Sequence, residues 1–544
     1  MKICVLQSSY DVSDSPFKNL DMYSDPSRWV KKHEFQHRYI HKNTAEQQID
    51  AACREEFDMY LNYMWGQPED DVAGVEAVKY LESKGVPFIG LPSHFLAKTK
   101  LDFRDAARRH GVRVPDDNTF PKIVKLANGC GSLDLTEDSV CYTQEAVEDQ
   151  VRLLKEKNGG REVVVQQFIV GEECSAMVLE MGNNVVALPP TMMRFPDDVD
   201  PMKRFMHWGN KVDAVTSGVI QEMFVEDEAK ASQLKQAAVA AFRAIGAAGG
   251  GAWARVDMRV DSEGKVYVLE VNPAPALFYP LSDVFRGDHV ILESFPGGHE
   301  ALMDMLIVTK LSQMRGFEKQ VTGVRSGYEE MAPKYDAASA ASNMGSIFTS
   351  IASECDLSGS VLDLGCGTGI FGRILHEVQP EKTSLLTGVD ISPAMLANPN
   401  VHAHYDTVLL SSMQEAAMTL EDFDHVVVFG CLHFLDPTIF SAVLSRLFFV
   451  ARRSITISVE DIPERYNDHL QKIGYGVMYS WNHTMAIRDF GVPKNWRITY
   501  DRRLDAWESP KTGDKVIATI LRYEYVDATK VVGQSNGTNG SSKY

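Results

Sequence analysis

Apolar and polar residues at the start of the chain follow patterns that predict strands and amphipathic helices in alternation. The opening segment MKICVLQSSY reads as a β-strand. Further on, a helical pattern that ends at Gly85 leads into the short apolar run VPFIG, which reads as another strand. Residues 1–95 therefore predict an α/β unit of the βαβ type.

The region 96–314 predicts a mixture of helices and strands of the α+β class. Its first part reads as a helix over 98–111, a strand over 123–127, a helix over 144–157 and a strand over 163–170. Its second part reads as a strand over 185–190, an irregular segment over 195–218, a helix over 228–247, a hairpin WARVDMRV and VYVLEVN across DSEG, and a helix over 299–314.

The last part of the chain predicts a separate α/β domain. Residues 315–326 lack clear periodicity, so we interpret them as a linker. A helix over 340–356 and the strands SVLDLG, LLTGVD and DHVVVFG then alternate with helical segments, as a doubly wound α/β sheet requires. The closing segment predicts a disordered tail. The predicted domains are 1–95, 96–314 and 327–527, with a linker over 315–326 and a tail over 528–544.

The composition limits the class of protein. The chain has 544 residues, more than one hydrophobic core usually organises, and a formal net charge of -19. This charge argues against nucleic-acid binding, which needs clustered Lys and Arg. We find no signal-peptide pattern and no apolar run long enough for a membrane span, and the eight cysteines lack any CxxC pair. We therefore expect a cytoplasmic protein with reduced thiols that acts on small molecules, without nucleic acid or membrane as a partner, and compatible with a homodimer.

Asp257, Glu270 and Asn272 form the first candidate site. They lie on the two strands of the predicted hairpin, where residues i and i+2 share a face, so their oxygen atoms converge. Mg²⁺ prefers a few carboxylate or amide oxygens together with the oxygens of a nucleotide phosphate. The trio therefore predicts a metal site. The alternative is a set of polar side chains on a solvated sheet face.

Residues upstream of this trio offer groups that suit a nucleotide. Lys125 lies on a strand followed by the small-residue loop ANGCGS, whose backbone N–H groups suit phosphates, and Lys100 precedes a helix. The strand VVVQQFIVGEE offers extended backbone to an adenine edge, and Glu173 offers a carboxylate to ribose hydroxyls. Each feature alone is a weak indication, because surface lysines are usually solvated.

Taken in order, these residues resemble an ATP-grasp ligase of the D-alanine:D-alanine ligase group over roughly residues 1–314. The resemblance implies a pre-ATP-grasp α/β domain followed by two α+β lobes, with ATP and two Mg²⁺ ions as cofactors. It also implies that ATP phosphorylates a carboxylic acid and that an amine then displaces phosphate. By resemblance, Lys100 and Lys125 contact the phosphates and Glu173 contacts the ribose. The adenine hinge runs from Gln166 to Ile169 and includes Gln167. The metal ligands are Asp257, Glu270 and Asn272.

Two further residues take catalytic roles by this resemblance. Lys211 matches a phosphate-contacting lysine of the mobile loop, and Arg255 matches the arginine that steadies the transferring phosphoryl group and the tetrahedral intermediate. The chain also departs from the family pattern. Gln166 replaces a hinge glutamate, Met206, Trp208 and Val212 replace loop tyrosines, and PAPALFYP follows Asn272. D-alanine is therefore a doubtful substrate, and the bulky residues of that segment suggest a more apolar pocket or plain core.

The glycine turn VLDLGCGTG at 361–369 forms the second candidate site. Gly365, Gly367 and Gly369 stand where a strand turns sharply into a helix and its backbone approaches a ligand. The next strand ends in Asp390, whose carboxylate suits a ribose diol. Two consecutive βα units therefore agree on a nucleotide-type ligand.

This pattern resembles motif I of class I S-adenosylmethionine methyltransferases, over roughly 327–525. The resemblance implies a Rossmann-like domain with S-adenosylmethionine as cofactor. It places Tyr335 near the methionine end, Asp363 at the cofactor's amino end, and Ser412 with Met413 at the adenine. His433 becomes a candidate substrate or base residue, with a satisfied histidine at a strand end as the equal alternative. Glu460 and Asp461 follow the strand SITISV, where substrate binding is one interpretation and a solvated loop is the favoured one.

Together the two sites predict a bifunctional enzyme of small-molecule, secondary-metabolite biosynthesis. One half joins a carboxylic acid to an amine, both amino-acid-like, and the other methylates the product or a reactant on nitrogen or oxygen. One alternative is a methyltransferase that is regulated by a non-catalytic ATP-binding half. A scaffold protein, which would bind neither ATP nor S-adenosylmethionine, is a third class.

Overall fold

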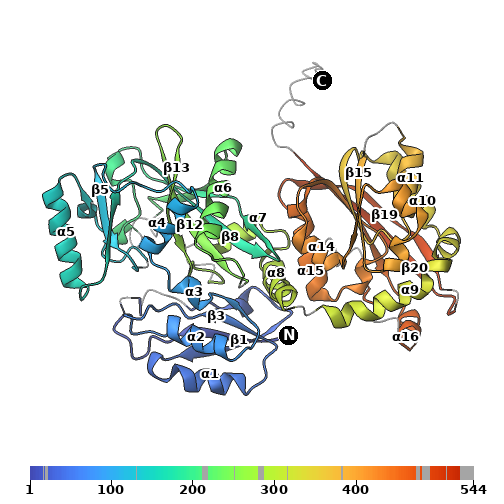
Figure 1. The fold of residues 1–544 in the computed structure, drawn as a ribbon, viewed down its shortest axis with the longest axis horizontal. Helices are drawn as coiled ribbons and strands as arrows, with labels where there is room; N and C mark the ends of the chain where they lie inside the picture. The colour runs from blue at the N-terminus through green and yellow to red at the C-terminus, as the bar shows by residue number, and fades with distance from the viewer. Residues whose placement is uncertain are drawn as a thin grey trace, which may run out of the picture. The chain divides into compact units, whose positions relative to one another are not determined.

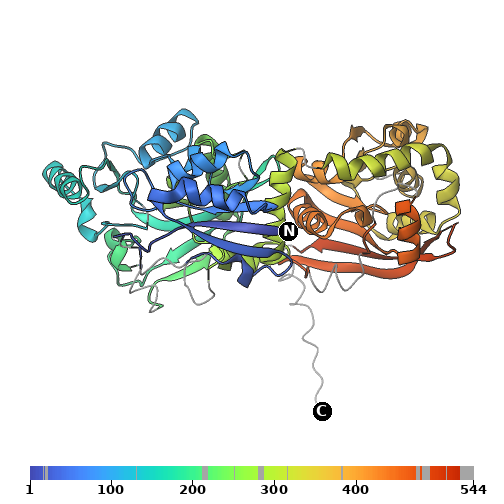
Figure 2. The ribbon, with the colours of Figure 1, turned by 90° about the horizontal axis from the view of Figure 1, so that it is seen from below.

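The computed structural model describes residues 1–544 apart from residues 16, 19–22, 130, 211–217, 250, 280–286, 315–316, 381–383, 473–477, 481–489, 510 and 527–544. The chain forms two compact units, Met1–Leu292 and Glu293–Tyr544. The predicted tail and Lys211 lie outside the described residues. Figures 1 and 2 show the elements of each unit.

The first unit opens with a parallel sheet in the order β2-β1-β3-β4. Its strands are β1 (Lys2–Ser8), β2 (Glu34–Ile40), β3 (Met59–Tyr63) and β4 (Phe88–Gly90). Helices α1 (Ala45–Cys53) and α2 (Val75–Ser83) connect them, and their apolar residues share one core with β1 and β3. The α/β unit predicted for residues 1–95 is therefore present.

A small three-stranded sheet follows, in the order β6-β5-β7. It contains β5 (Lys122–Leu126), β6 (Val140–Cys141) and β7 (Val163–Gln167). Helix α5 (Gln144–Lys157) packs on β5 and β7 through Val147 and Leu154. Short helix α3 (Ser93–Leu96) and helix α4 (Lys100–Arg109) precede this lobe, and a capping box at Thr99 fixes the start of α4. The face of this sheet that α5 does not cover is available for contacts with other groups.

The largest sheet of this unit is antiparallel, with the order β11-β10-β8-β12-β13 and β9 paired to β8. Its strands are β8 (Gly171–Met181), β9 (Asn184–Ala187), β10 (Thr191–Arg194), β11 (Gln221–Phe224), β12 (Trp253–Asp261) and β13 (Val266–Asn272). Helix α6 (Glu228–Ala244) covers one face, where Ala254, Val256 and Met258 are buried. Because side chains alternate along a strand, Arg255 and Asp257 face away from α6.

The second unit is built on a seven-stranded sheet in the order β16-β15-β14-β17-β18-β20-β19. Its parallel strands are β14 (Gly359–Leu364), β15 (Ser384–Asp390), β16 (Thr407–Leu410), β17 (Phe423–Val428) and β18 (Ala451–Asp461). The strands β19 (Trp496–Glu508) and β20 (Lys515–Tyr525) form an antiparallel edge. The order reverses between β14 and β17, where open α/β sheets bind ligands at the carboxyl ends.

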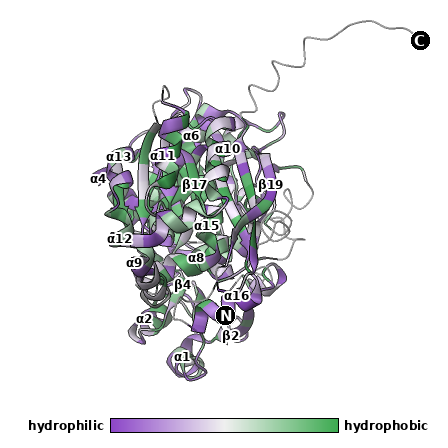
Figure 3. Ribbon diagram, turned by 90° about the vertical axis from the view of Figure 1, so that its right-hand side faces the viewer, coloured by the Kyte–Doolittle hydropathy of each residue, from purple (hydrophilic) through white to green (hydrophobic). Residues whose placement is uncertain are grey.

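Helices cover both faces of this sheet (Figure 1). On one face, α10 (Met344–Glu354), α11 (Ile370–Val378) and α13 (Pro399–His404) form one layer. On the other, α14 (Met413–Thr419), α15 (Pro437–Val450) and α8 (Gly298–Gln313) pack in sequence. The apolar sides of α8 and α15 are green in Figure 3, in keeping with their burial. Smaller helices of this unit are α12 (Pro393–Leu396) and α16 (Glu464–Lys472), whereas α7 (Gly287–Ser294) lies at the end of the first unit.

Most of residues 315–326, for which the sequence predicts a linker, belong to the long helix α9 (Glu318–Ala340), drawn in yellow-green in Figure 2. Sparse apolar residues hide this helix from a periodicity analysis. The predicted helices over 144–157 and 299–314 are confirmed within a residue by α5 and α8. No helix among the described residues is long and apolar enough to cross a membrane. The cysteines that the structure describes are all free thiols.

Candidate functional sites

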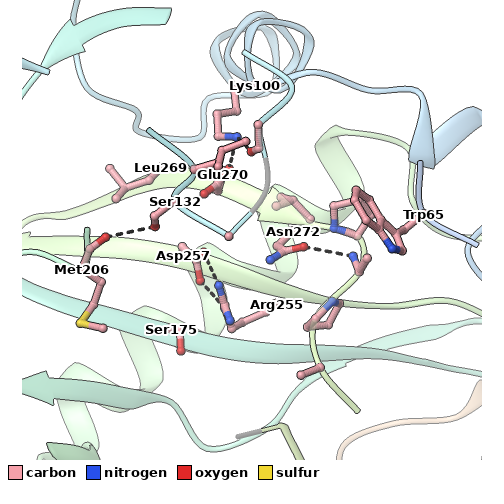
Figure 4. A pocket seen from close by; sticks show the side chains of 18 of the residues that line it. Trp65, Lys100, Ser132, Ser175, Met206, Arg255, Asp257, Leu269, Glu270 and Asn272 are labelled. Carbon is pink, nitrogen blue, oxygen red and sulfur yellow. Dashed lines mark hydrogen bonds and ion pairs between the residues drawn. The ribbon is translucent and has the colours of Figure 1, made fainter. Parts of the chain in front are cut away.

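A cavity of about 670 Å³ lies between the small sheet and the exposed face of the large sheet in the first unit. Lys125 and Gln166 line it from the small sheet, and Arg255 and Glu270 from the large one. Every first-half residue predicted for a site, apart from Lys211, borders this one cavity: Lys100, Lys125, Gln166, Gln167, Ile169, Glu173, Arg255, Asp257, Glu270 and Asn272. Figure 4 shows the part around β12 and β13.

Glu270 is surrounded by lysines. Lys100 Nζ lies 2.9 Å from its Oε2 and also donates a hydrogen bond of 2.5 Å to the carbonyl oxygen of Gly129 in the glycine loop. Burial raises the pKa of the Glu270 carboxyl, but Lys100 and Lys125 outweigh this effect and hold the pKa at about 2. Burial lowers the pKa of Lys125, against the attraction of Glu270. This end of the cavity therefore suits an anion with several oxygens.

Arg255 and Asp257 form a bidentate ion pair on β12. The Nε and Nη2 of Arg255 donate hydrogen bonds of 2.6 and 2.9 Å to the two carboxylate oxygens. Although burial lowers the pKa of Arg255, Asp257 raises it above its ordinary value. Asp257 is paired in register with Glu270, and Arg255 with Asn272, as the hairpin spacing predicts (Figure 4).

Two carboxylates and one amide oxygen thus face one cavity, as hard divalent cations require. Within the described part of the chain no group of three His, Cys, Asp or Glu side chains is arranged to hold a metal. The third ligand here is the amide of Asn272, whose Oδ1 accepts a hydrogen bond of 3.1 Å from Ala274 N. The donor set fits Mg²⁺, with Lys100 and Arg255 as the present counter-ions of the two acids.

The predicted adenine hinge leaves β7 at Gln167. The backbone N–H of Gln167 donates to Asp116 O and that of Phe168 to Pro121 O, each at 2.7 Å, so the hinge is tied to the preceding loop. Glu173, predicted for the ribose, accepts hydrogen bonds from Met206 N at 3.0 Å and Arg259 Nη1 at 3.2 Å. Arg259, which sequence reasoning did not single out, is 2% exposed and therefore orients this carboxylate.

The segment after Asn272 is held by a buried acid. Asp288 accepts hydrogen bonds of 2.7 and 2.8 Å from the backbone N–H groups of Phe278 and Tyr279. Phe278 has a φ of +61°, which is unfavourable for a bulky residue. Leu277 and Phe278 are fully buried core residues, whereas Tyr279 lines the cavity. Asp288 therefore keeps a strained backbone next to the candidate site.

The glycine turn of the second unit joins β14 to α11. Gly365 and Gly369 have φ of +83° and +79°, and a Cβ at Gly365 would lie 2.8 Å from Cys431 Sγ. Asp390, at the end of β15, accepts hydrogen bonds of 2.9 Å from Gly367 N and from Ser392 N. The carboxylate predicted for a ribose diol thus also holds the glycine turn. Burial raises the pKa of Asp390.

Helix α9 contacts the same turn. The Cε1 atom of Tyr335 lies 3.7 Å from the position a Cβ would take at Gly367. One residue on, Asp336 accepts a hydrogen bond of 2.5 Å from Thr368 Oγ1. The aromatic side chain predicted for the methionine end is thus beside the turn, and Asp336 is an additional residue that fixes it there.

Asp363 and Ser412 point into the protein rather than into open space. Asp363 Oδ2 accepts a hydrogen bond of 2.6 Å from the hydroxyl of Tyr405, and burial raises the pKa of this acid to about 7. Ser412 is buried and caps α14 by accepting from Glu415 N, with Met413 as the first residue of the helix. Both residues lie near the carboxyl ends of their strands, at the edge of the sheet where a cofactor is expected. Their described hydrogen bonds are with other residues of the protein and help to hold the fold.

His433 belongs to a buried polar chain at the carboxyl ends of β17 and β18. Its Nδ1 lies 3.0 Å from Glu460 Oε2, Glu460 accepts a short hydrogen bond from Ser458, and Ser458 Oγ accepts one of 2.7 Å from Gly430 N. The expectation of a solvated loop at Glu460 and Asp461 is wrong, because both lie in β18 and Glu460 is fully buried.

Two family models match the chain. Residues 86–282 match the family described as D-ala D-ala ligase C-terminus, and residues 361–453 match the family described as methyltransferase domain. The first range contains all the predicted ligands of the cavity, and the second contains the glycine turn, Asp390 and His433. These matches confirm the predicted fold class, an ATP-grasp fold followed by a Rossmann-like methyltransferase domain.

Individual relatives align with only part of the chain. The carbamoyl phosphate synthase large chain of Rubrobacter xylanophilus is 29% identical, over 43% of this chain and 23% of its own length. The D-alanine--D-alanine ligase of Cupriavidus metallidurans is 28% identical, over 36% of this chain and 61% of its own length. That of Herminiimonas arsenicoxydans is 30% identical, over 43% of this chain and 71% of its own length. The chain thus spans less than two thirds of the first two relatives.

Proposed function

The N-terminal half of this chain belongs to the D-alanine--D-alanine ligase family of ATP-grasp proteins, and on this premise we propose a bifunctional ligase and methyltransferase. The proposed ligase joins a carboxylic acid to an amine at the expense of ATP. The proposed methyltransferase uses S-adenosylmethionine. The observation that carries the proposal is the single cavity that contains Lys100, Lys125, Arg255, Asp257 and Glu270.

The proposed ligation has two steps. An oxygen of the acid attacks the terminal phosphorus of ATP, ADP leaves, and an acyl phosphate forms. The amine nitrogen then attacks the acyl carbon, the bond from carbon to the phosphate oxygen breaks, and the amine loses a proton. Both steps build negative charge on oxygen, which preorganised cations stabilise. The chain needs no nucleophile of its own.

The charges that line the cavity suit these steps. Lys100 contacts the glycine loop at Gly129, and Lys125 lines the same cavity. Both would contact phosphate oxygens, while Arg255 would contact the oxygens of the reacting acyl and phosphoryl groups. Mg²⁺ held by Asp257, Glu270 and Asn272 would neutralise phosphate charge when bound. Lys100 and Arg255, which now pair with Glu270 and Asp257, would then be available to the substrate oxygens. We propose that the ordered hinge at Gln166, Gln167 and Ile169 holds the adenine and Glu173 the ribose.

We propose that the second unit moves a methyl group from the sulfonium of S-adenosylmethionine to a nitrogen or oxygen of the ligation product or of one reactant. The glycine turn, Asp390 and Tyr335 would hold the cofactor, and Ser412 with Met413 would border the adenine. In-line alignment of the acceptor with the breaking S–C bond provides most of what such a transfer needs. His433 would face the acceptor at the carboxyl end of β17.

Two variants of the full chain test the proposal. The parent protein is incubated with ATP, Mg²⁺, S-adenosylmethionine and a mixture of amino and carboxylic acids, and ADP, condensation products and added methyl groups are measured. Asp257→Ala should abolish ADP release and leave S-adenosylmethionine binding intact. Gly367→Arg should abolish that binding and leave ADP release intact.

The outcomes separate the proposed function from its alternatives. Binding of ATP without turnover on any acid, together with a methyl transfer that responds to ATP, indicates the regulatory function instead. Absence of any thermal shift with ATP and with S-adenosylmethionine indicates a scaffold. Loss of both activities in either variant shows that the two units work only in concert.

A further inference from the structure

Five aromatic side chains form a continuous surface on the same cavity, which we call the aromatic wall: Tyr10, Phe17, Tyr23, Trp65 and Trp208. Neighbouring ring centroids are 5.9 Å apart for Trp208 and Phe17, 5.7 Å for Phe17 and Trp65, 6.4 Å for Trp65 and Tyr10, and 5.9 Å for Tyr10 and Tyr23. Tyr10, Phe17 and Tyr23 come from one segment, whereas Trp65 and Trp208 are distant in the sequence, so no single motif reveals the set.

Two polar groups of the wall are engaged within it, since the Tyr23 hydroxyl accepts a hydrogen bond of 3.4 Å from Tyr10 N and the indole nitrogen of Trp65 is also bonded. Trp65 Nε1 donates a hydrogen bond of 3.0 Å to the hydroxyl of Tyr10, so the indole presents ring surface to the cavity. Phe17, Tyr23 and Trp65 are partly exposed, whereas core aromatics such as Phe242 are buried and do not line the cavity. Pockets for organic ligands combine such apolar surface with a few polar groups, and Arg255 and Asn272 supply those here.

The spacing of the rings decides what kind of ligand fits. An aromatic cage for a methylated ammonium places several rings around one cation, each within about 6 Å of it, so facing rings stand well apart. Here each ring touches the next in tilted or edge-to-face contact. The rings therefore make one continuous apolar surface on the cavity. A flat or bulky apolar group can stack on such a wall.

The wall also adjoins the loop expected to cover phosphates. A Cβ at Gly131 would lie 2.7 Å from Cε1 of Phe17, so this ring packs directly on the glycine loop. Trp208 is tied to the same lobe by a hydrogen bond of 3.2 Å from its backbone N–H to Leu135 O. A group stacked on Phe17 and Trp65 is consequently next to the end of the cavity where phosphates would bind.

We propose that the aromatic wall binds the side chain of an aromatic amino acid and that this amino acid is one of the two ligation substrates. The inference rests on the proposed ligase function for its second part. Phe17 and Trp65 are then specificity-determining residues, and the small side chain of alanine leaves the wall largely uncovered. Because one methylene already changes discrimination about 10- to 200-fold, loss of a whole ring should weaken binding at least about 100-fold.

Equilibrium binding separates this inference from the proposed function. The full chain, with a non-hydrolysable ATP analogue and Mg²⁺, is titrated with L- and D-phenylalanine, L- and D-alanine, and choline. One phenylalanine enantiomer should bind at least about 100-fold more tightly than either alanine. Preference for alanine, or for choline as a cation without a ring, overturns the inference. Tight phenylalanine binding without ADP release from ATP contradicts the proposed function and leaves the binding site intact.

Variants assign the binding to the wall. Phe17→Ala and Trp65→Ala should each reduce phenylalanine affinity at least about tenfold, and Trp65→Phe should retain most of it. Tyr142→Ala is the matched control, because Tyr142 is 61% exposed and does not line the cavity. Melting temperatures and affinity for the ATP analogue show that each variant is folded. Phenylalanine affinity that is unchanged in folded Phe17→Ala and Trp65→Ala proteins, and equal in Tyr142→Ala, places the ligand elsewhere and overturns the inference.

Discussion

His433 Nδ1 and Glu460 Oε2 lie 3.0 Å apart, and the two side chains are almost completely shielded from solvent. A carboxylate at Nδ1 favours the tautomer with a proton there and leaves Nε2 as an acceptor. If His433 faces the methyl acceptor, Glu460 is a positioning residue that acts through the imidazole.

We therefore expect Glu460→Gln and His433→Asn each to slow methyl transfer from S-adenosylmethionine about 10- to 100-fold, because both substitutions disturb the same hydrogen-bonded pair. The double variant should be no slower than the slower single variant. His425→Asn is a control, since His425 is also buried but lies at the opposite end of β17. Additive rate losses in the double variant would show that the two residues act separately.

Asp363 should make the stability of the protein depend on pH. Burial raises its pKa from 3.8 to about 7, so the folded protein keeps a proton that the unfolded chain has lost. Its stabilising contribution is complete below about pH 3.8 and disappears as pH rises through about 7. Asp363→Asn should therefore gain stability relative to the parent between pH 5 and pH 8, measured as a difference in melting temperature.

Asp424, which lies on strand β17, should show the opposite dependence of stability on pH. Hydrogen bonds from the backbone N–H and hydroxyl of Ser360 lower the pKa of Asp424. Asp424→Asn should therefore lose stability relative to the parent as pH rises above the acid range. Parallel behaviour of the two variants would contradict the assigned direction for Asp363.

Lys100→Met should weaken nucleotide binding and raise the pKa of Glu270. The depressed pKa of about 2 means that Glu270 stabilises the fold above its unfolded value near 4.5 and loses this effect as pH falls towards 2. The melting-temperature deficit of Lys100→Met should consequently be larger at pH 7 than at pH 3. Calorimetry should show ATP affinity reduced about 10- to 100-fold, the range for a charge-assisted hydrogen bond. Lys79→Met, at an exposed pair with Glu76, should match the parent.

Arg255→Lys keeps a positive charge but loses the planar fork that now binds Asp257. We expect ADP release and condensation to slow about 100-fold, because one preorganised donor to a developing oxyanion is typically worth that much. ATP affinity should change less than about threefold. Arg113→Lys, whose guanidinium stacks on Tyr267 outside the cavity, is the control. Equal loss of binding and turnover in Arg255→Lys would assign Arg255 to ground-state binding.

Asp288→Asn should loosen the segment that follows Asn272. The carboxylate accepts from two backbone N–H groups, and an amide can replace it at only one of them, so about 1–3 kcal/mol of stability should be lost. Because Phe278 holds a positive φ, the released backbone should relax. Hydrogen exchange of the amides at 274–279 should become faster. Unchanged exchange there, with a lower melting temperature, would mean that Asp288 acts elsewhere in the core.

Local sequence determined much of the first site. Alternation along two strands placed Asp257, Glu270 and Asn272 on one face, and the hairpin register confirms that Asp257 stands opposite Glu270. The glycine turn likewise led to Asp390, which accepts a hydrogen bond from Gly367 N. Such patterns are readable because a strand or a tight turn fixes side-chain direction within a few residues.

Tertiary structure alone decided the rest. The aromatic wall brings Tyr10 and Phe17 together with Trp65 and Trp208, which are far from them in the sequence. Glu460 is buried because β18 lies inside a seven-stranded sheet. Asp288 clamps a backbone ten residues upstream at Phe278. Burial and long-range contacts depend on how the elements pack. The local sequence around a polar residue near a strand end is the same whether water or protein covers that residue.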